Sequence, residues 1–302
     1  MKQALRLTAG AIVLAALAWY VYHVREHLAG LLHVHPKYLL PMIIVPLASL
    51  AINGWIGREL AAEFGPKLGF VEWYGLAVVN SLANYLPVPQ AGAMARGVYL
   101  KRVHKLPYGP FAATLVVTYA TALTLYGLLG LSGLLALRVL DRPSPLLLWL
   151  IFIALTCTAL LLTPATHFLP IPQKYAHLND SLRTMRRHHL LGRIIFLQAC
   201  LVTMTSTGLW LACKTLHGGE NVTWTAAVMM GLIILASGIA NVTPGNVGVE
   251  QFAAEMTARL LHLPPYVGLA ASAIFRAVSM VVVIVIGPFF AAALGRLSRQ
   301  VA

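Results

Sequence analysis

Long apolar runs recur along this chain and limit what it can fold into. The uninterrupted runs cover about 4–22, 38–56, 108–137, 146–163, 193–213 and 265–291. A helix that crosses the hydrocarbon core of a bilayer needs about 20 such residues. Charged residues make up 10% of the chain, whereas soluble domains carry about 25%. The sequence therefore predicts an all-α polytopic membrane protein, with its first span at 4–22 retained rather than cleaved as a signal peptide.

Two further apolar stretches, at about 70–100 and 222–262, are interrupted by Pro and Gly near their middles. Basic residues cluster near 96–105, near 174–193 and at both ends of the chain. Such clusters remain on the cytoplasmic side of a membrane. All of them can do so only if each interrupted stretch enters and leaves the membrane on the same side.

This topology amounts to six transmembrane helices plus two opposed re-entrant helical hairpins, with both termini in the cytoplasm. An arrangement of eight full spans also keeps both ends inside, and it remains the alternative. In that arrangement the loop at 57–69 and the basic cluster at 101–105 fall on opposite sides of the membrane.

The two interrupted stretches resemble each other in sequence. "ANYLP" at 83–87 and "ANVTP" at 240–244 share Ala-Asn-x-x-Pro at an offset of 241 − 84 = 157. The same offset pairs Arg102 with Arg259. Because the hairpins enter from opposite faces, this pattern predicts an inverted-topology repeat, as is common in secondary transporters. We expect one transmembrane domain, 1–302, with repeat halves 1–140 and 141–302.

The second interruption, "NVTPGN", predicts a break in the helix within the membrane. Irregular backbone at that depth is tolerated only where it contacts protein or lines a watery cavity. A half-helix is expected to begin near Asn246, and its free N–H groups and positive dipole end suit an anion. The candidate substrate-binding residues here are Asn241, Gly245, Asn246 and Gly248. A simple hairpin turn without further function remains the alternative.

The first interruption supplies the matching candidates Asn84 and Gly92. Arg96 follows on the same half-helix, close to the basic loop. It is expected to recruit an anionic headgroup at the cytoplasmic face. Alternatively, Arg96 is merely the first residue of the cytoplasmic basic cluster.

Two ionisable residues fall where the membrane makes charge costly. Glu250 lies about one turn into the second half-helix, and Arg276 lies near the middle of the run at 265–291. An ionised side chain at such depth needs a partner or water, so we expect these two residues to pair. The pair either stabilises the fold only, or lines a transport cavity in which Arg276 takes a phosphate and Glu250 a cation or proton. Glu255 and Arg259 have the spacing of an ordinary pair on a helix surface.

Other polar residues carry weaker signals. A cluster of histidines at 23–35 has spacings that can bind metal but lacks an acidic or cysteine partner, so neither a metal site nor a cofactor is expected. Threonines share one face of the run at 108–137, where they act as contacts between helices or as a cavity lining. The net charge of +13 suits anionic lipid headgroups. Nucleic acid is not an expected partner, because no soluble basic domain carries this charge.

The block "PGNVGVEQFAAE", followed by "FRAVSMVVVIVIGPF", resembles the transmembrane family of lysylphosphatidylglycerol synthase, also called flippase-like. In the first half, "QAGAMARGVYLKR" resembles the family with Gly92 and Arg96 at the matching places. Asn246 stands where a glycine is usual, and "VVTYATALTLYG" lacks the charges that the family often carries after the first hairpin. The matching positions in the second half are Pro244, Gly245, Gly248, Glu250, Arg276 and Gly287.

This resemblance implies translocation of an anionic phospholipid or a lipid-linked precursor, such as a polyprenyl-linked one, across a bacterial or archaeal inner membrane. Membrane lipids are then the expected partners. Without an aminoacyl-transferase domain in these 302 residues, we expect neither lysine transfer nor an enzyme. Two alternatives remain. One is a membrane-embedded enzyme or accessory subunit for a lipid-linked substrate, and the other is a transporter of small solutes or ions.

Overall fold

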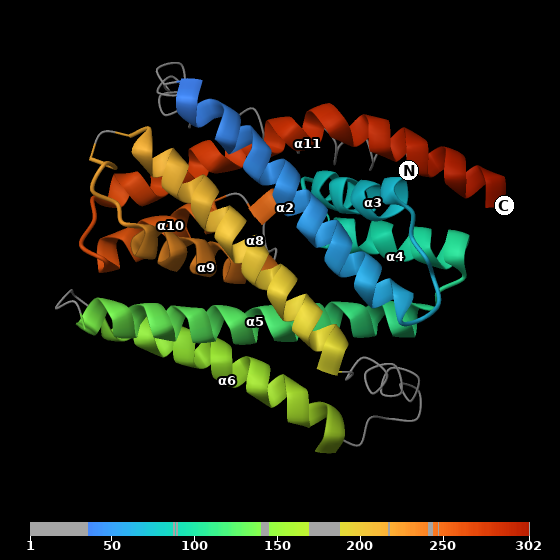
Figure 1. Ribbon diagram of the computed structural model, residues 1–302, viewed down its shortest axis with the longest axis horizontal. Coiled ribbons are helices and arrows are strands. Elements are labelled where there is room, and N and C mark those ends of the chain that lie inside the picture. Colours follow the sequence, from blue (N-terminus) through green and yellow to red (C-terminus); the bar gives the residue numbers. More distant parts are fainter. Residues whose placement is uncertain are drawn as a thin grey trace, which may run out of the picture.

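The regular elements of this protein are helices throughout the described chain (Figure 1). The computed structural model describes residues 36–86, 88, 90–139, 145–168, 188–216, 218–240, 244–246 and 248–301. The helices are α2 (Pro36–Ala62), α3 (Phe70–Ala83), α4 (Ala91–His104), α5 (Tyr108–Val139), α6 (Leu146–Phe168), α8 (His188–Lys214), α9 (Trp224–Ala240), the short 3-10 helix η2 (Pro244–Asn246), α10 (Val249–Leu260) and α11 (Pro265–Val301). The predicted all-α fold is confirmed.

Four described helices contain segments that are long and apolar enough to cross a membrane. These segments are Tyr38–Ala62 in α2, Tyr108–Val139 in α5, His189–Lys214 in α8 and Tyr266–Gln300 in α11. The run predicted at 146–163 falls within α6, whereas the span predicted at 4–22 lies outside the described residues. The chain is therefore a multi-pass membrane protein.

The two interrupted stretches each form a pair of short helices. Helices α3 and α4 have 14 residues each, α9 has 17 and α10 has 12. All four are shorter than the about 20 residues that a helix needs to cross the hydrocarbon core. We call α3 with α4 the first hairpin and α9 with α10 the second. Their tips are the connecting segments at 84–90 and 241–248.

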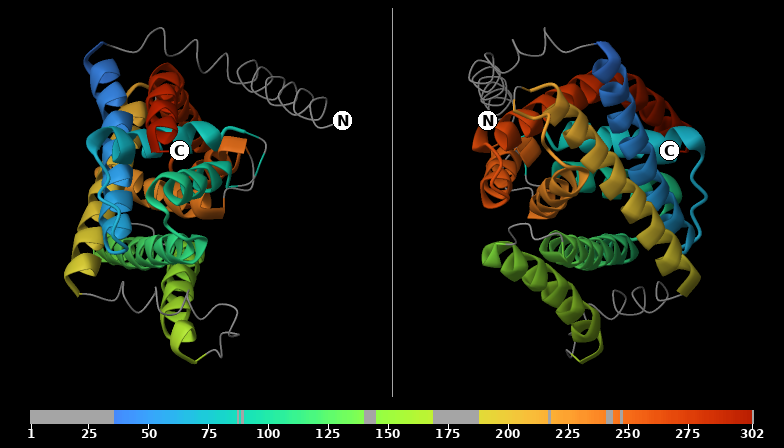
Figure 2. Two further views of the ribbon diagram at one scale, coloured as in Figure 1. Left: turned by 90° about the vertical axis from the view of Figure 1, so that its right-hand side faces the viewer. Right: turned by 60° about the vertical axis from the view of Figure 1, so that its left-hand side comes forward.

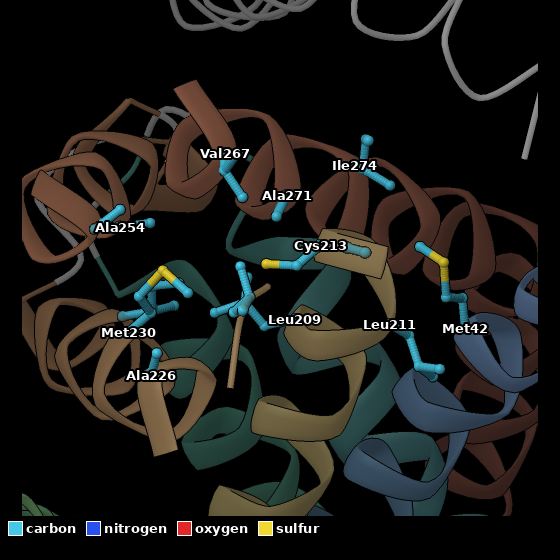
Figure 3. Close-up of a cluster of buried hydrophobic side chains, with 14 residues drawn as sticks. Met42, Leu209, Leu211, Cys213, Ala226, Met230, Ala254, Val267, Ala271 and Ile274 are labelled. Carbon is cyan, nitrogen blue, oxygen red and sulfur yellow. The ribbon is translucent and has the colours of Figure 1, made fainter. Parts of the chain in front are cut away.

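Two clusters of buried side chains define opposite ends of the helix bundle. One joins the end of α2, the open end of the first hairpin, the start of α5 and the end of α11, through Ala61, Leu100, Phe111 and Leu294. The other joins the start of α2, the end of α8, the open end of the second hairpin and the start of α11 (Figure 3), where Met42, Cys213, Ala226 and Val267 are labelled. The two hairpins therefore approach each other from opposite ends.

Helix boundaries follow the offset seen in the sequence. The first residue of α5 is Tyr108, and 108 + 157 = 265 is the first residue of α11. Likewise α3 ends at Ala83, and 83 + 157 = 240 is the last residue of α9. Helix α2 precedes the first hairpin in the chain and α8 precedes the second. These two helices pack side by side across one face of the molecule (Figures 1 and 2). The described helices thus form two sets of four in the same order.

Helix α6 stands outside both sets and packs on α5 (Figure 2). Two glycines of α5 allow this close approach. A Cβ atom at Gly127 would collide with Thr156, and one at Gly130 would collide with the ring of Phe152. Small residues at such contacts let helices in a membrane pack tightly.

A carboxylate joins the two helices at the open end of the first hairpin. Glu72 accepts hydrogen bonds from the Gly69 amide at 3.0 Å and from the Tyr99 hydroxyl group at 3.0 Å. Its Oε1 atom also lies 2.7 Å from Nε2 of His104. The start of α3 is thereby tied to the end of α4.

The Glu72→Ala substitution is expected to lower the free energy of unfolding by about 1–3 kcal/mol, because it leaves partly buried donors unpaired. Thermal unfolding in detergent measures the change. The control is Glu255→Ala, which removes an exposed pair and should cost less than about 1 kcal/mol. Equal losses in the two variants would contradict this role of Glu72.

Candidate functional site

The tips of the two hairpins contact each other. The Gly245 amide donates a hydrogen bond to the main-chain oxygen of Asn84 at 2.6 Å. The Gln90 side-chain amide donates to the main-chain oxygen of Ile239 at 3.2 Å. The two breaks recognised in the sequence therefore lie together, although they are far apart along the chain.

The second tip requires glycine at position 245. Gly245 has φ of +59°, in the left-handed region that side chains other than glycine rarely adopt. A Cβ atom at this position would also collide with the ring of Tyr85 in the first tip. Glycine thus permits both the turn and the close approach of the two hairpins.

The half-helices that leave the tips are capped by their own chain. Helix α10 begins at Val249, three residues later than the start expected near Asn246 (249 − 246 = 3). The Gly248 amide donates to Oε1 of Gln251 at 2.7 Å. In the first hairpin the Gly92 amide donates to Oδ1 of Asn84 at 3.0 Å. These two N–H groups are therefore occupied.

Glu250 and Arg276 form the expected ion pair beside the second tip. Nη1 of Arg276 lies 3.2 Å from both carboxylate oxygens of Glu250. Asn246, which is buried, donates from Nδ2 to Glu250 Oε1 at 3.3 Å and also lies 3.3 Å from the hydroxyl oxygen of Ser237. The Arg276 guanidinium lies 5.4 Å from the centre of the Tyr85 ring. The pair thus connects α10, α11 and both tips.

A cavity of about 340 Å³ lies against this junction. Among its lining residues the charged side chains are Glu250 and Arg276, and Asn84 and Tyr85 of the first tip also contribute. Its neutral polar lining includes Ser49, Asn53, Ser81, Gln198, Thr205 and Ser279. Pockets of this size with a few placed polar groups are typical binding sites for small molecules. The arrangement can hold a polar or charged group inside an otherwise apolar helix bundle.

The structure brings most of the predicted site residues to one place. Gly92 joins the junction through Asn84, and Gly248 is exposed at the start of α10. Arg96 does not line the cavity, and its side chain packs against α2 instead. Asn241 lies outside the described residues. The predicted residues at the junction itself are Asn84, Gly245, Asn246, Glu250 and Arg276.

Sequence reasoning missed several residues of the site. Tyr85 stands inside the repeated "ANYLP" motif, so its position next to Asn84 was the available signal. Gln198 is a lone amide within the apolar run 193–213, and it is 2% exposed and lines the cavity. Thr118 also lines the cavity, while its hydroxyl group donates to the Thr114 carbonyl of its own helix. The alternative of a cavity lining is correct for this threonine.

Comparison with known proteins yields one family. Residues 6–287 match the sequence model of the family described as "Lysylphosphatidylglycerol synthase TM region". The match includes both hairpins, their tips and Arg276. No curated protein matches the chain.

Proposed function

Because the chain belongs to the lysylphosphatidylglycerol synthase TM region family, a family of membrane proteins linked to lipid handling, we propose that it translocates lipid headgroups. The substrate is an anionic phospholipid or a lipid-linked precursor, including polyprenyl-linked ones. The membrane is the bacterial or archaeal cytoplasmic membrane. The chain moves its substrate and does not change it chemically.

The observation that carries this proposal is the polar cavity at the meeting point of the two hairpin tips. In the proposed path the headgroup enters this cavity, while the acyl chains remain in the surrounding lipid. The hairpin helices of 12 to 17 residues support re-entrant segments, because they are too short to cross the bilayer. Their approach from opposite ends and the shared offset of helix boundaries support an inverted repeat.

The distribution of basic residues supports an orientation. Arg193 at the start of α8 pairs with Glu59 near the end of α2 at 3.2 Å, which places both at the open end of the first hairpin. The end of α11 lies there as well. By the positive-inside rule this end faces the cytoplasm, and so do both termini. The described basic residues near this end include Arg58, Lys67, Lys101, Arg102, Lys105, Arg193, Arg296 and Arg299.

The ion pair gives the proposed path its selectivity. Arg276 would donate to a phosphate oxygen of the headgroup, while Glu250 would take a proton or an amine. Because the two charges balance, the lining of the cavity carries little net charge. Amide and hydroxyl groups such as those of Gln198 and Ser279 would replace water around the rest of the headgroup.

The test is translocation in proteoliposomes that contain short-chain fluorescent phosphatidylglycerol, with the outer leaflet quenched by an impermeant reductant. The protein is expected to increase the quenched fraction. Glu250→Gln should slow this protein-dependent quenching about tenfold or more, as loss of a charged partner generally does. Glu255→Gln, an exposed site on the same helix, should retain the rate.

Other outcomes would contradict lipid translocation. If the protein adds no quenching but accelerates uptake of a small anion, the cavity serves a solute, which its volume of about 340 Å³ would also hold. If a lipid-linked substrate is instead converted to a new product, the chain is an enzyme. Equal translocation rates for wild type and Glu250→Gln would show that the ion pair takes no part in translocation.

A further inference from the structure

Arg96 lies between helices rather than in the exposed basic loop that follows it. The residue is on α4, in the first hairpin, and its guanidinium packs against Gly57 of α2. A Cβ atom at position 57 would collide with the guanidinium, so glycine provides the space that this side chain occupies. Arg102, further along α4, is exposed. Arg96 is therefore distinct from the cytoplasmic basic cluster.

No described residue balances the charge of Arg96. Throughout the described chain no hydrogen bond or ion pair involves Arg96, and its Nε atom is buried without a partner. Other arginines have glutamate partners, including Arg193 with Glu59 at 3.2 Å and Arg276 with Glu250 at 3.2 Å. An unpaired guanidinium inside a membrane protein is costly and commonly marks a functional site.

The surroundings of Arg96 connect it to the cavity. Tyr119 of α5 lies near Arg96 and also lines the cavity. Lys101 and Arg102 are exposed at the far end of α4. Basic residues thus follow α4 from the exposed Lys101 and Arg102 to Arg96. Tyr119 is both a neighbour of Arg96 and part of the cavity lining. Basic groups of this kind attract ligands of opposite sign.

We propose that Arg96, between α2, α4 and α5, is a phosphate-binding site for the anionic headgroup, separate from the Glu250–Arg276 pair. The planar guanidinium presents a fork of N–H donors that matches two oxygens of a phosphate. In this proposal the Tyr119 hydroxyl group adds a hydrogen bond. A bound phosphate would balance the charge that the described residues leave unpaired. This proposal depends on the proposed function. The site would hold the headgroup before it reaches the tips.

Binding of short-chain phosphatidic acid to purified protein in neutral detergent tests the site, with native mass spectrometry as the readout. Arg96→Gln should weaken this binding about tenfold or more, because it removes a charge-assisted contact. Arg102→Gln changes a charge of the same sign on the same helix, and its effect should stay below about threefold. Binding of diacylglycerol, which lacks phosphate, should not respond to Arg96→Gln.

A second variant and a stability measurement separate binding from folding. Gly57→Ala retains the charge but displaces the guanidinium, so it should also weaken phosphatidic acid binding. Without lipid, the melting temperature of Arg96→Gln should equal or exceed that of wild type, because the variant removes an unpaired charge. A lower melting temperature with unchanged lipid binding would assign Arg96 a purely structural role and overturn the proposal.

The source of the phosphate and the proposed function are tested separately. Inorganic phosphate that binds as tightly as phosphatidic acid would indicate a site for a free anion and overturn a headgroup site. Wild-type binding of phosphatidic acid by Arg96→Gln, or an equal loss in Arg102→Gln, would overturn it as well. If wild type binds phosphatidic acid through Arg96 but shows no translocation in proteoliposomes, flipping fails and this site stands.

Discussion

Replacing Arg276 by alanine is expected to abolish headgroup translocation and to lower the free energy of unfolding by about 3–5 kcal/mol, the cost of leaving one member of a buried pair alone. Glu250 is 9% exposed, and its remaining partner in the structure would be the amide of Asn246. Denaturation of the purified protein in mixed detergent micelles measures the stability, and the proteoliposome assay measures the rate.

A double variant separates the two roles of this pair. Glu250→Gln with Arg276→Met removes both charges and keeps similar volumes, so most of the lost stability should return. Translocation should remain absent, because no charge is left in the cavity at the tips to bind the headgroup. If the double variant translocates like wild type, the pair stabilises the fold and nothing more. If the single variant Arg276→Ala is as stable as wild type, the Glu250–Arg276 pair does not stabilise the fold.

The Gly245→Ala substitution is expected to separate the hairpin tips and to slow translocation about tenfold or more, because the added methyl group collides with Tyr85. The left-handed backbone at this position, with φ of +59°, adds strain of about 1–3 kcal/mol. The translocation rate and the melting temperature are measured on the same preparation. Both are expected to fall.

Gly248→Ala is the matched control for this prediction. Gly248 also has positive φ, at +85°, but a Cβ atom there would meet no atom within 4 Å. This variant carries backbone strain without a collision between the tips. It should lose stability but retain more of the translocation rate than Gly245→Ala. Equal rates in the two variants would show that strain in the loop, and not contact between the tips, governs transport.

The sequence was sufficient for features that depend on local pattern. Apolar runs of spanning length, the broken stretches and the motif offset of 157 predicted the helices and their order. The pairing of Glu250 with Arg276 was also predictable, since each is costly alone at that depth. The i,i+4 pair of Glu255 and Arg259 forms at 3.1 Å, as its spacing indicated.

Features that depend on distant contacts were not predictable. Nothing in "QAGAMARGVYLKR" distinguishes Arg96, which packs against another helix, from the exposed Arg102, because the packing of Arg96 depends on Gly57 in α2. Helix α10 begins three residues after Asn246, and there the Gly248 amide donates to the Gln251 side chain, a contact that the motif alone does not predict. In the sequence Gln198 is an isolated polar residue within an apolar run. Its place in the cavity lining depends on the contact between α5 and α8, which the sequence does not show.

The contact between the tips also sets the order in which the cavity can form during biosynthesis. The carbonyl group of Asn84 and the amide of Gly245 are separated by 245 − 84 = 161 residues. Translation must therefore continue through α9 before the first tip can meet its partner. Contacts of such long range form late and slowly. Until then the polar tip of the first hairpin and the guanidinium of Arg96 lack the contacts that the second half provides. If translation stalled in α8, the insertion machinery would have to shield both groups from the lipid.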